Sequence, residues 1–129
     1  MGQGYLLDSN AVIDYTANLL PDISKQKVNR IIDDAFNISV VVKIEVLGYN
    51  DLPDKMKQLE TFLDLARVFP LDDDITTKTI HLRRTYKKLK LGDAVIATTA
   101  IINDFILISR NTKDFKTIQG LEVVDPYGL

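Results

Sequence analysis

The stretch "LLDSNAVIDY", from Leu6 to Tyr15, places an aspartate between two apolar segments. The residues before it, 4–7, predict a short buried strand, and the residues after it, 9–20, predict a helix that Pro21 ends. Asp8 therefore stands where a buried strand passes directly into a helix. Considered alone, such an aspartate is explained equally well as a helix cap or as a metal ligand.

The rest of the chain alternates predicted strands with predicted helices. The strands are mostly continuous apolar runs without a two-residue period, which indicates a parallel sheet covered by helices on both faces. We therefore expect an α/β sandwich with a mostly parallel sheet of four to five strands, formed by one domain over residues 1–129. The further strands are expected at 38–42, 67–71, 105–109 and 121–125, and the further helices at 24–35, 43–49, 53–66, 72–89 and 93–102.

The composition is that of a soluble globular protein, with 46% hydrophobic and 26% charged residues in 129. The absence of cysteine excludes disulfides, thiolate zinc sites and cysteine nucleophiles, so a metal must be held by oxygen or by the single histidine, His81. We expect no role for His81, which lies on the predicted helix at 72–89, away from the acidic residues near the ends of the strands. The longest apolar run, 94–102, is shorter than the roughly 20 residues that span a bilayer, so a cytoplasmic protein without a membrane anchor is expected.

Several acidic residues follow predicted strands or open predicted helices. Asp8 ends the first strand, Glu45 follows the second by about one turn, and Asn111 and Asp114 follow the fourth. Asp93 opens the helix whose small side chains allow close packing on the sheet. Because ligands of open α/β sheets bind at the carboxyl ends of the strands, we expect the four acids to meet in one cleft.

Four carboxylates in one cleft would raise one another's pKa and resist ionising together. A divalent cation removes this conflict, and oxygen ligands with water suit Mg²⁺ or Mn²⁺. Such an ion can activate water and neutralise charge that develops on a phosphoryl group. The residues therefore predict phosphodiester hydrolysis. Asp14 is expected to be an ordinary acidic residue of the first helix.

Four blocks of the sequence together resemble a PIN domain of the VapC toxin type. They are "LLDSNAVIDY", "VVVKIEVLGY", "LGDAVIATTAIINDFILISRNTKDF" and "GLEVVDPY", and they cover nearly the whole chain in order. The resemblance implies a three-layer PIN-like sandwich and a Mg²⁺- or Mn²⁺-dependent ribonuclease, usually the toxin of a toxin–antitoxin pair. It further implies a 5′-phosphate product, a homodimer, and an antitoxin whose C-terminal segment occupies the groove.

The resemblance also implies roles for individual residues. The acidic tetrad would be Asp8, Glu45, Asp93 and Asp114, with Asp8, Asp93 and Asp114 as metal ligands and Glu45 acting on the attacking water. Ser9 and Asn111 would be polar neighbours of the site, and Thr99 a helix residue beneath it. Two positions depart from the family: Gly92 stands where proline is frequent, and Asn111 where many members have a further aspartate, which leaves the number of metal ions open.

Basic residues offer candidate contacts to RNA phosphates. Lys43, Arg110 and Lys113 lie near the predicted cleft in the sequence. The stretch "RRTYKKLK" at 83–90 holds five basic residues, which fit an RNA path, a partner surface or a solvated helix face equally well. Phosphate binding by such residues would depend on salt and not on RNA sequence.

Two other functions compete with the ribonuclease. A non-catalytic interaction module could keep the fold and bind a partner or RNA, although such a copy has no reason to keep all four acids. An aspartate-dependent phosphatase or phospho-acceptor domain also begins with a strand that ends in aspartate. Nucleophilic aspartate phosphatases need a second acid two residues after the first, where this chain has Asn10.

Overall fold

The centre of the molecule is a set of five short parallel strands. The computed structural model describes residues 2–129, and its first sheet has the order β1 (Gly4–Leu7), β4 (Phe105–Ile108) and β5 (Val123–Val124). A second pair joins β2 (Asn37–Ser39) to β3 (Arg67–Phe69), also in parallel. The expected parallel α/β architecture is therefore confirmed.

The two sheets meet where β1 lies beside β2. The Asn37 side-chain amide donates a hydrogen bond of 3.0 Å to the Tyr5 carbonyl and so joins the two strands. The spatial order is then β3, β2, β1, β4, β5, and the direction of progression reverses between β1 and β4. The backbone N–H of Asp8 donates to the Ile108 carbonyl at 3.0 Å, which places this aspartate directly at the reversal. Such a reversal is where open α/β sheets bind ligands.

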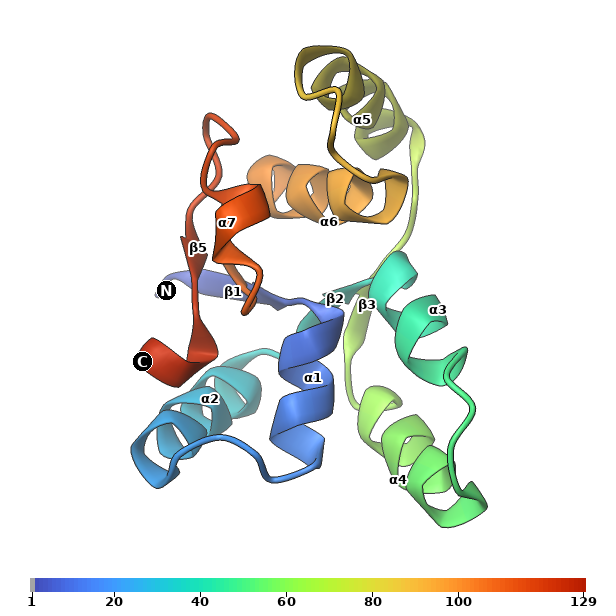
Figure 1. Ribbon diagram of the computed structural model, residues 1–129, viewed down its shortest axis with the longest axis vertical. Helices are drawn as coiled ribbons and strands as arrows, with labels where there is room; N and C mark the ends of the chain where they lie inside the picture. The colour runs from blue at the N-terminus through green and yellow to red at the C-terminus, as the bar shows by residue number, and fades with distance from the viewer. Residues whose placement is uncertain (1) are drawn as a thin grey trace.

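Helices cover both faces of the strands and produce three layers. In Figure 1 the strands lie between α5 and α6 on one side and α1 and α2 on the other. The side chains of Ala97 and Ala100 on α6 are fully buried, so this helix packs closely on the sheet as expected. None of the helices within residues 2–129 is long and apolar enough to cross a bilayer. The helices are α1 (Ser9–Thr16), α2 (Asp22–Asp34), α3 (Val40–Leu47), α4 (Pro53–Leu63), α5 (Asp73–Thr85), α6 (Leu91–Ile102), α7 (Thr112–Phe115) and the 3₁₀ helix η1 (Pro126–Gly128).

The predicted strand at 38–42 is wrong in its second half. Only residues up to Ser39 are extended, and Val40 begins α3. The Ser39 hydroxyl accepts a hydrogen bond of 3.1 Å from the Val41 backbone N–H, which caps the new helix. Val42 is fully buried and Val40 and Val41 are partly buried, because α3 packs against α1, α4 and α6, and a short apolar run of this kind does not distinguish a packed helix from a buried strand.

Two predicted boundaries near residue 90 are also wrong. The helix expected to reach residue 89 ends at Thr85, because Tyr86 leaves the helical conformation and its hydroxyl accepts a hydrogen bond of 2.9 Å from the Gln119 backbone N–H. Residues 86–90 therefore form a loop. The helix expected to start at residue 93 starts at Leu91, so Gly92 lies in its first turn.

Candidate active site

Asp8 is held at the end of β1 by a ring of hydrogen-bond donors. The residue is only 5% exposed, and its carboxylate accepts hydrogen bonds from the Ser9 backbone N–H (2.8 Å), the Ser109 hydroxyl (2.7 Å) and the Asn10 amide (3.4 Å). Burial raises the pKa of Asp8, the bonds from Ser109 and Ser9 lower it, and the charge of Glu45 raises it further. Asp8 is thus the N-cap of α1 and at the same time part of an acidic cluster.

Glu45 reaches the same place from α3. Its carboxylate accepts a hydrogen bond of 2.6 Å from the hydroxyl of Ser9, the residue that follows Asp8. Ser9 therefore lies beside the acids, at the position that the sequence predicts. Lys43 also lies on α3, two positions before Glu45. Residues two positions apart in a helix are separated by about 200° around its axis, so the Lys43 side chain leaves α3 on nearly the opposite side from Glu45.

Asp93 lies in the first turn of α6, and burial together with the charges of the other three acids raises its pKa. Burial is the largest cause that raises its pKa to about 6, followed by the negative charges of Asp8 and Glu45. The positive charge of Lys90 acts in the opposite direction, and the charge of Asp114 adds a smaller increase. The tertiary structure therefore brings together the four carboxylates that the sequence predicts, from four separate elements.

Asp114 lies on α7, and Asn111 orients its side chain. The Asn111 amide donates to the Asp114 carboxylate at 3.0 Å, and the Asn111 backbone N–H donates to the Ser109 hydroxyl, also at 3.0 Å. Thr99, which the resemblance places on the helix beneath the site, lies on α6, but its hydroxyl does not contact the acids. Its buried hydroxyl donates to the Val95 carbonyl at 2.7 Å within α6.

Ser109 and Asn10 are two site residues that sequence reasoning missed. The buried Ser109 hydroxyl donates to Asp8 and accepts from the backbone of Asn111, so it connects β1 to the loop before α7. The Asn10 amide contacts both Ser109 (3.2 Å) and Asp8. A polar residue at the end of each neighbouring apolar strand was the signal available in the sequence.

Asp14 was expected to be an ordinary helix acid, and this is wrong. The residue is 4% exposed, and its carboxylate accepts a hydrogen bond of 3.0 Å from the Tyr127 hydroxyl. It also pairs with the Arg110 guanidinium at 2.9 Å. Arg110 was predicted to contact RNA phosphates, but its side chain is turned to Asp14, and its backbone N–H donates to the Asn10 side chain at 3.0 Å.

The four acids match a divalent ion in the type of their donor atoms. All offer carboxylate oxygen, which Mg²⁺ and Mn²⁺ prefer. The negative charges of the other acids raise the pKa of Asp93, and a bound cation would lower that pKa again. Within residues 2–129, however, no three Asp, Glu or His side chains already have the spacing of a coordination shell. The cluster therefore suits such an ion in chemistry, and its ligands must approach one another to hold it.

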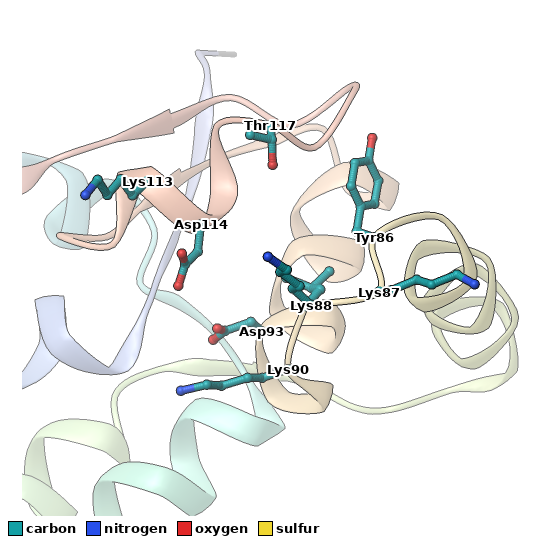
Figure 2. Close-up of a pocket in the computed structure, with 9 residues that line it drawn as sticks. Tyr86, Lys87, Lys88, Lys90, Asp93, Lys113, Asp114 and Thr117 are labelled. Carbon is teal, nitrogen blue, oxygen red and sulfur yellow. The ribbon is translucent and has the colours of Figure 1, made fainter.

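A cavity of about 330 Å³ opens beside Asp93 and Asp114. Its other walls come from the 86–90 loop, from Lys113 on α7 and from Thr117, two residues beyond the end of α7. Figure 2 shows the amines of Lys88 and Lys90 on the side of the two acids, whereas Lys87 extends away towards α5. The basic stretch predicted at 83–90 is thus divided, because α5 ends at Thr85 and only the loop residues reach the acidic cluster.

Comparisons with known proteins agree with this architecture. The family model described as "PIN domain" matches residues 5–121. A toxin–antitoxin complex from Klebsiella pneumoniae contains a chain that is 30% identical, with 96% of this chain and 98% of that chain covered and a TM-score of 0.75. A search of curated proteins gave no significant match.

Two further solved structures share the fold at lower identity. DNA-bound VapBC from Salmonella typhimurium has a TM-score of 0.81 at 20% identity, covering 97% of this chain and 99% of that chain. VapBC-1 from nontypeable Haemophilus influenzae has a TM-score of 0.78 at 23% identity, with coverage of 95% and 97%. These matches confirm the resemblance to VapC-type PIN domains that the sequence motifs predict. The chain belongs to the PIN-domain family.

Proposed function

We propose that this protein is a Mg²⁺- or Mn²⁺-dependent endoribonuclease and the toxin of a type II toxin–antitoxin pair. The observation that carries the proposal is the meeting of Asp8, Glu45, Asp93 and Asp114 where the strand order reverses, with charges close enough to raise the pKa of Asp93 to about 6. Membership of the PIN-domain family and the similarity to a chain of a toxin–antitoxin complex support it.

Each acidic residue has a role that follows from its surroundings. When bound, the divalent ion supplies activation of water and neutralisation of charge on the phosphoryl group. Asp8, Asp93 and Asp114 hold the ion, and the bonds from Ser109 and Asn111 keep two of these carboxylates oriented towards it. Such bonds behind metal ligands usually contribute to metal affinity.

Glu45 takes the proton of the attacking water. It is exposed, and its bond from the Ser9 hydroxyl leaves its second carboxylate oxygen free to accept that proton. Since Ser9 follows Asp8 directly, the same bond ties the proton acceptor to a metal ligand. In-line attack of this water on an RNA phosphodiester would break the bond between phosphorus and the 3′ oxygen, which leaves as a 3′-hydroxyl after taking a proton from solvent, and the other product carries the 5′-phosphate.

The partners of the protein are part of the same proposal. The similar chain from Klebsiella pneumoniae comes from a toxin–antitoxin complex, so we infer a separate antitoxin that blocks the cleft of this chain. We also infer a homodimer that acts in the cytoplasm. Size-exclusion chromatography with light scattering tests the dimer, and co-expression with the neighbouring reading frame tests the antitoxin.

Cleavage of a labelled RNA tests the reaction. We expect cleavage with Mn²⁺, loss of cleavage with EDTA, and a decrease of at least about 100-fold in rate for Asp93→Asn, because a carboxylate ligand becomes a neutral amide. Asp54→Asn, a change of an exposed acid in the first turn of α4, serves as the control and should cleave like the parent. Cleavage that resists EDTA or survives in Asp93→Asn would show that the metal-dependent mechanism is wrong.

The alternatives make different predictions. A non-catalytic module would bind RNA without cutting it under any metal condition. A phosphatase or phospho-acceptor domain would form an aspartyl-phosphate at Asp8. Asn10 stands where such a phosphatase needs its second acid, and its side-chain amide donates to the Asp8 carboxylate at 3.4 Å; an amide cannot act as the general acid, which disfavours this alternative.

A further inference from the structure

We propose that the loop of residues 86–90 forms, with α7, a subsite for one nucleotide of single-stranded RNA beside the scissile phosphate. Lys88 and Lys90 bind the backbone phosphate of that nucleotide. The inference rests on the proposed nuclease function and names how its substrate is held. Its basis is the cavity of about 330 Å³ that these two lysines share with Asp93 and Asp114.

The orientation of the lysines distinguishes them from their neighbour. In Figure 2 the amines of Lys88 and Lys90 lie on the side of the cavity where the acids are, and Lys87 points to the opposite side of the loop. Lys90 is near enough to Asp93 to lower the pKa of that acid. Within the described part of the chain, neither Lys88 nor Lys90 has a carboxylate oxygen within 4.0 Å, so both amines can bind an external anion.

The loop is anchored at both ends of its basic segment. The Tyr86 hydroxyl accepts the Gln119 backbone N–H at 2.9 Å, and the Leu89 side chain is buried in the core with 7% exposure. The Leu89 backbone N–H also donates to the Tyr86 carbonyl at 3.0 Å, which closes a turn. The lysines therefore project from a fixed turn, and less conformational entropy is lost when they bind a phosphate.

Charge and size indicate the ligand. RNA that approaches four carboxylates brings more negative charge, and nearby cations offset this repulsion. A cavity of about 330 Å³ lies at the small end of the roughly 300–1,000 Å³ range of ligand sites, which fits one nucleotide and excludes a base pair. A single-stranded substrate is therefore favoured over a duplex.

Binding in EDTA tests the subsite without cleavage. The probe is a fluorescein-labelled single-stranded RNA of mixed sequence, and its anisotropy is measured with the full chain over a range of salt concentrations. For single strands, each phosphate contact contributes a slope of about 0.7 in log K against log salt. We expect Lys88→Gln and Lys90→Gln each to lower the slope by about 0.7, and the double variant to lower it by about 1.4.

Lys87→Gln is the matched control: Lys87 also lines the cavity, but its amine extends away from Asp93 and Asp114, so the change removes the same charge from the same loop without removing an amine on the side of the acids. It should leave the slope unchanged. All three lysines are exposed, so the variants should fold, and circular dichroism checks this. Equal slope changes in all three variants, or none, would overturn the proposal, because they would indicate a diffuse charge effect or no contact. A polyglutamate peptide that binds with the same dependence on Lys88 and Lys90 would overturn it in favour of an acidic protein partner.

The outcomes separate this inference from the proposed function. If the parent cleaves RNA but the slopes do not respond to Lys88 and Lys90, the subsite is wrong and the nuclease stands. If the slopes respond as expected but no metal supports cleavage, the chain binds RNA at this loop and the nuclease function is wrong. With cleavage intact, Lys88→Gln should raise KM and leave kcat within about twofold, since a uniform binding contact is lost.

Discussion

Replacing Arg110 by methionine should destabilise the protein, because the change leaves the Asp14 carboxylate buried without its positive partner. The Asp14 side chain is 6% exposed, and the 2.9 Å contact to Arg110 is its one ion pair within residues 2–129. The ion pair joins α1 to the segment between β4 and α7, which also carries Asn111 and leads into the helix of Asp114. Its loss should therefore also loosen part of the acidic cluster.

The size of the effect follows from the unequal burial of the two partners. Breaking a fully buried pair costs about 3–5 kcal/mol, but the Arg110 side chain is 53% exposed, so water screens the contact. The hydrogen bond from Tyr127 to Asp14 remains. We therefore expect Arg110→Met to lower the free energy of unfolding by about 2 kcal/mol. Asp14→Asn should cost only about 1 kcal/mol, because the unpaired guanidinium is free to be hydrated.

Urea unfolding of the two single variants and the double variant measures the pairwise term. We expect a coupling energy of about 1 kcal/mol between positions 14 and 110. Arg84→Met is the control, because Arg84 is exposed on α5 and has no carboxylate within 4.0 Å in the described chain. This control variant should change the free energy of unfolding by less than about 0.5 kcal/mol. A coupling energy of zero, with Arg110→Met as stable as Arg84→Met, would refute the reasoning.

Three further predictions concern the acids and one close backbone approach. In EDTA, Asp93→Asn should be more stable than the parent above pH 6. The pKa of Asp93 is about 6 in the folded state against an ordinary 3.8, so the protonated acid stabilises the fold at low pH, and this contribution is lost as the pH rises to about 6. Thermal unfolding of both proteins over a range of pH measures the difference. Ser109→Ala should weaken Mn²⁺ binding by roughly 10- to 100-fold in calorimetry, because Asp8 loses the donor that holds its carboxylate; unchanged affinity would contradict this role. Gly4→Ala should lower the free energy of unfolding by about 1–3 kcal/mol, because its Cβ would lie 2.5 Å from the Phe105 ring, and a neutral result would mean that the ring moves freely.

The sequence by itself was sufficient for the order of strands and helices and for the four acids. Continuous apolar runs such as 105–109 that alternate with helical patterns indicate a parallel sheet covered on both faces, so the α/β class followed from the pattern of residues. Asp8 and Asp114 could be found because each follows such a run at the carboxyl end of a strand. Glu45 was placed there because it follows the second strand by about one turn, and Asp93 because it opens the helix that packs on the sheet; the resemblance to PIN domains then implied the roles of the four acids.

Boundaries that depend on local hydrogen bonds were not accessible from the pattern of residues. Val40 to Val42 have high strand propensity, yet the Ser39 hydroxyl caps a helix there, and packing of α3 on three other helices outweighs that propensity. The end of α5 depends on the bond between Tyr86 and Gln119, which are 33 residues apart. No window of local sequence contains both partners.

Only the tertiary structure decided which polar residues form ion pairs and hydrogen bonds with one another. The sequence made Asp14 and Arg110 look like independent surface charges, but the return of the chain after β4 brings them to 2.9 Å and buries the acid. The same return brings Ser109 to Asp8, and the end of α5 at Thr85 turns Lys88 and Lys90 towards the acidic cavity. Burial and pairing of charges depend on contacts between distant segments, so the sequence determined the candidates, and the fold decided which of them meet.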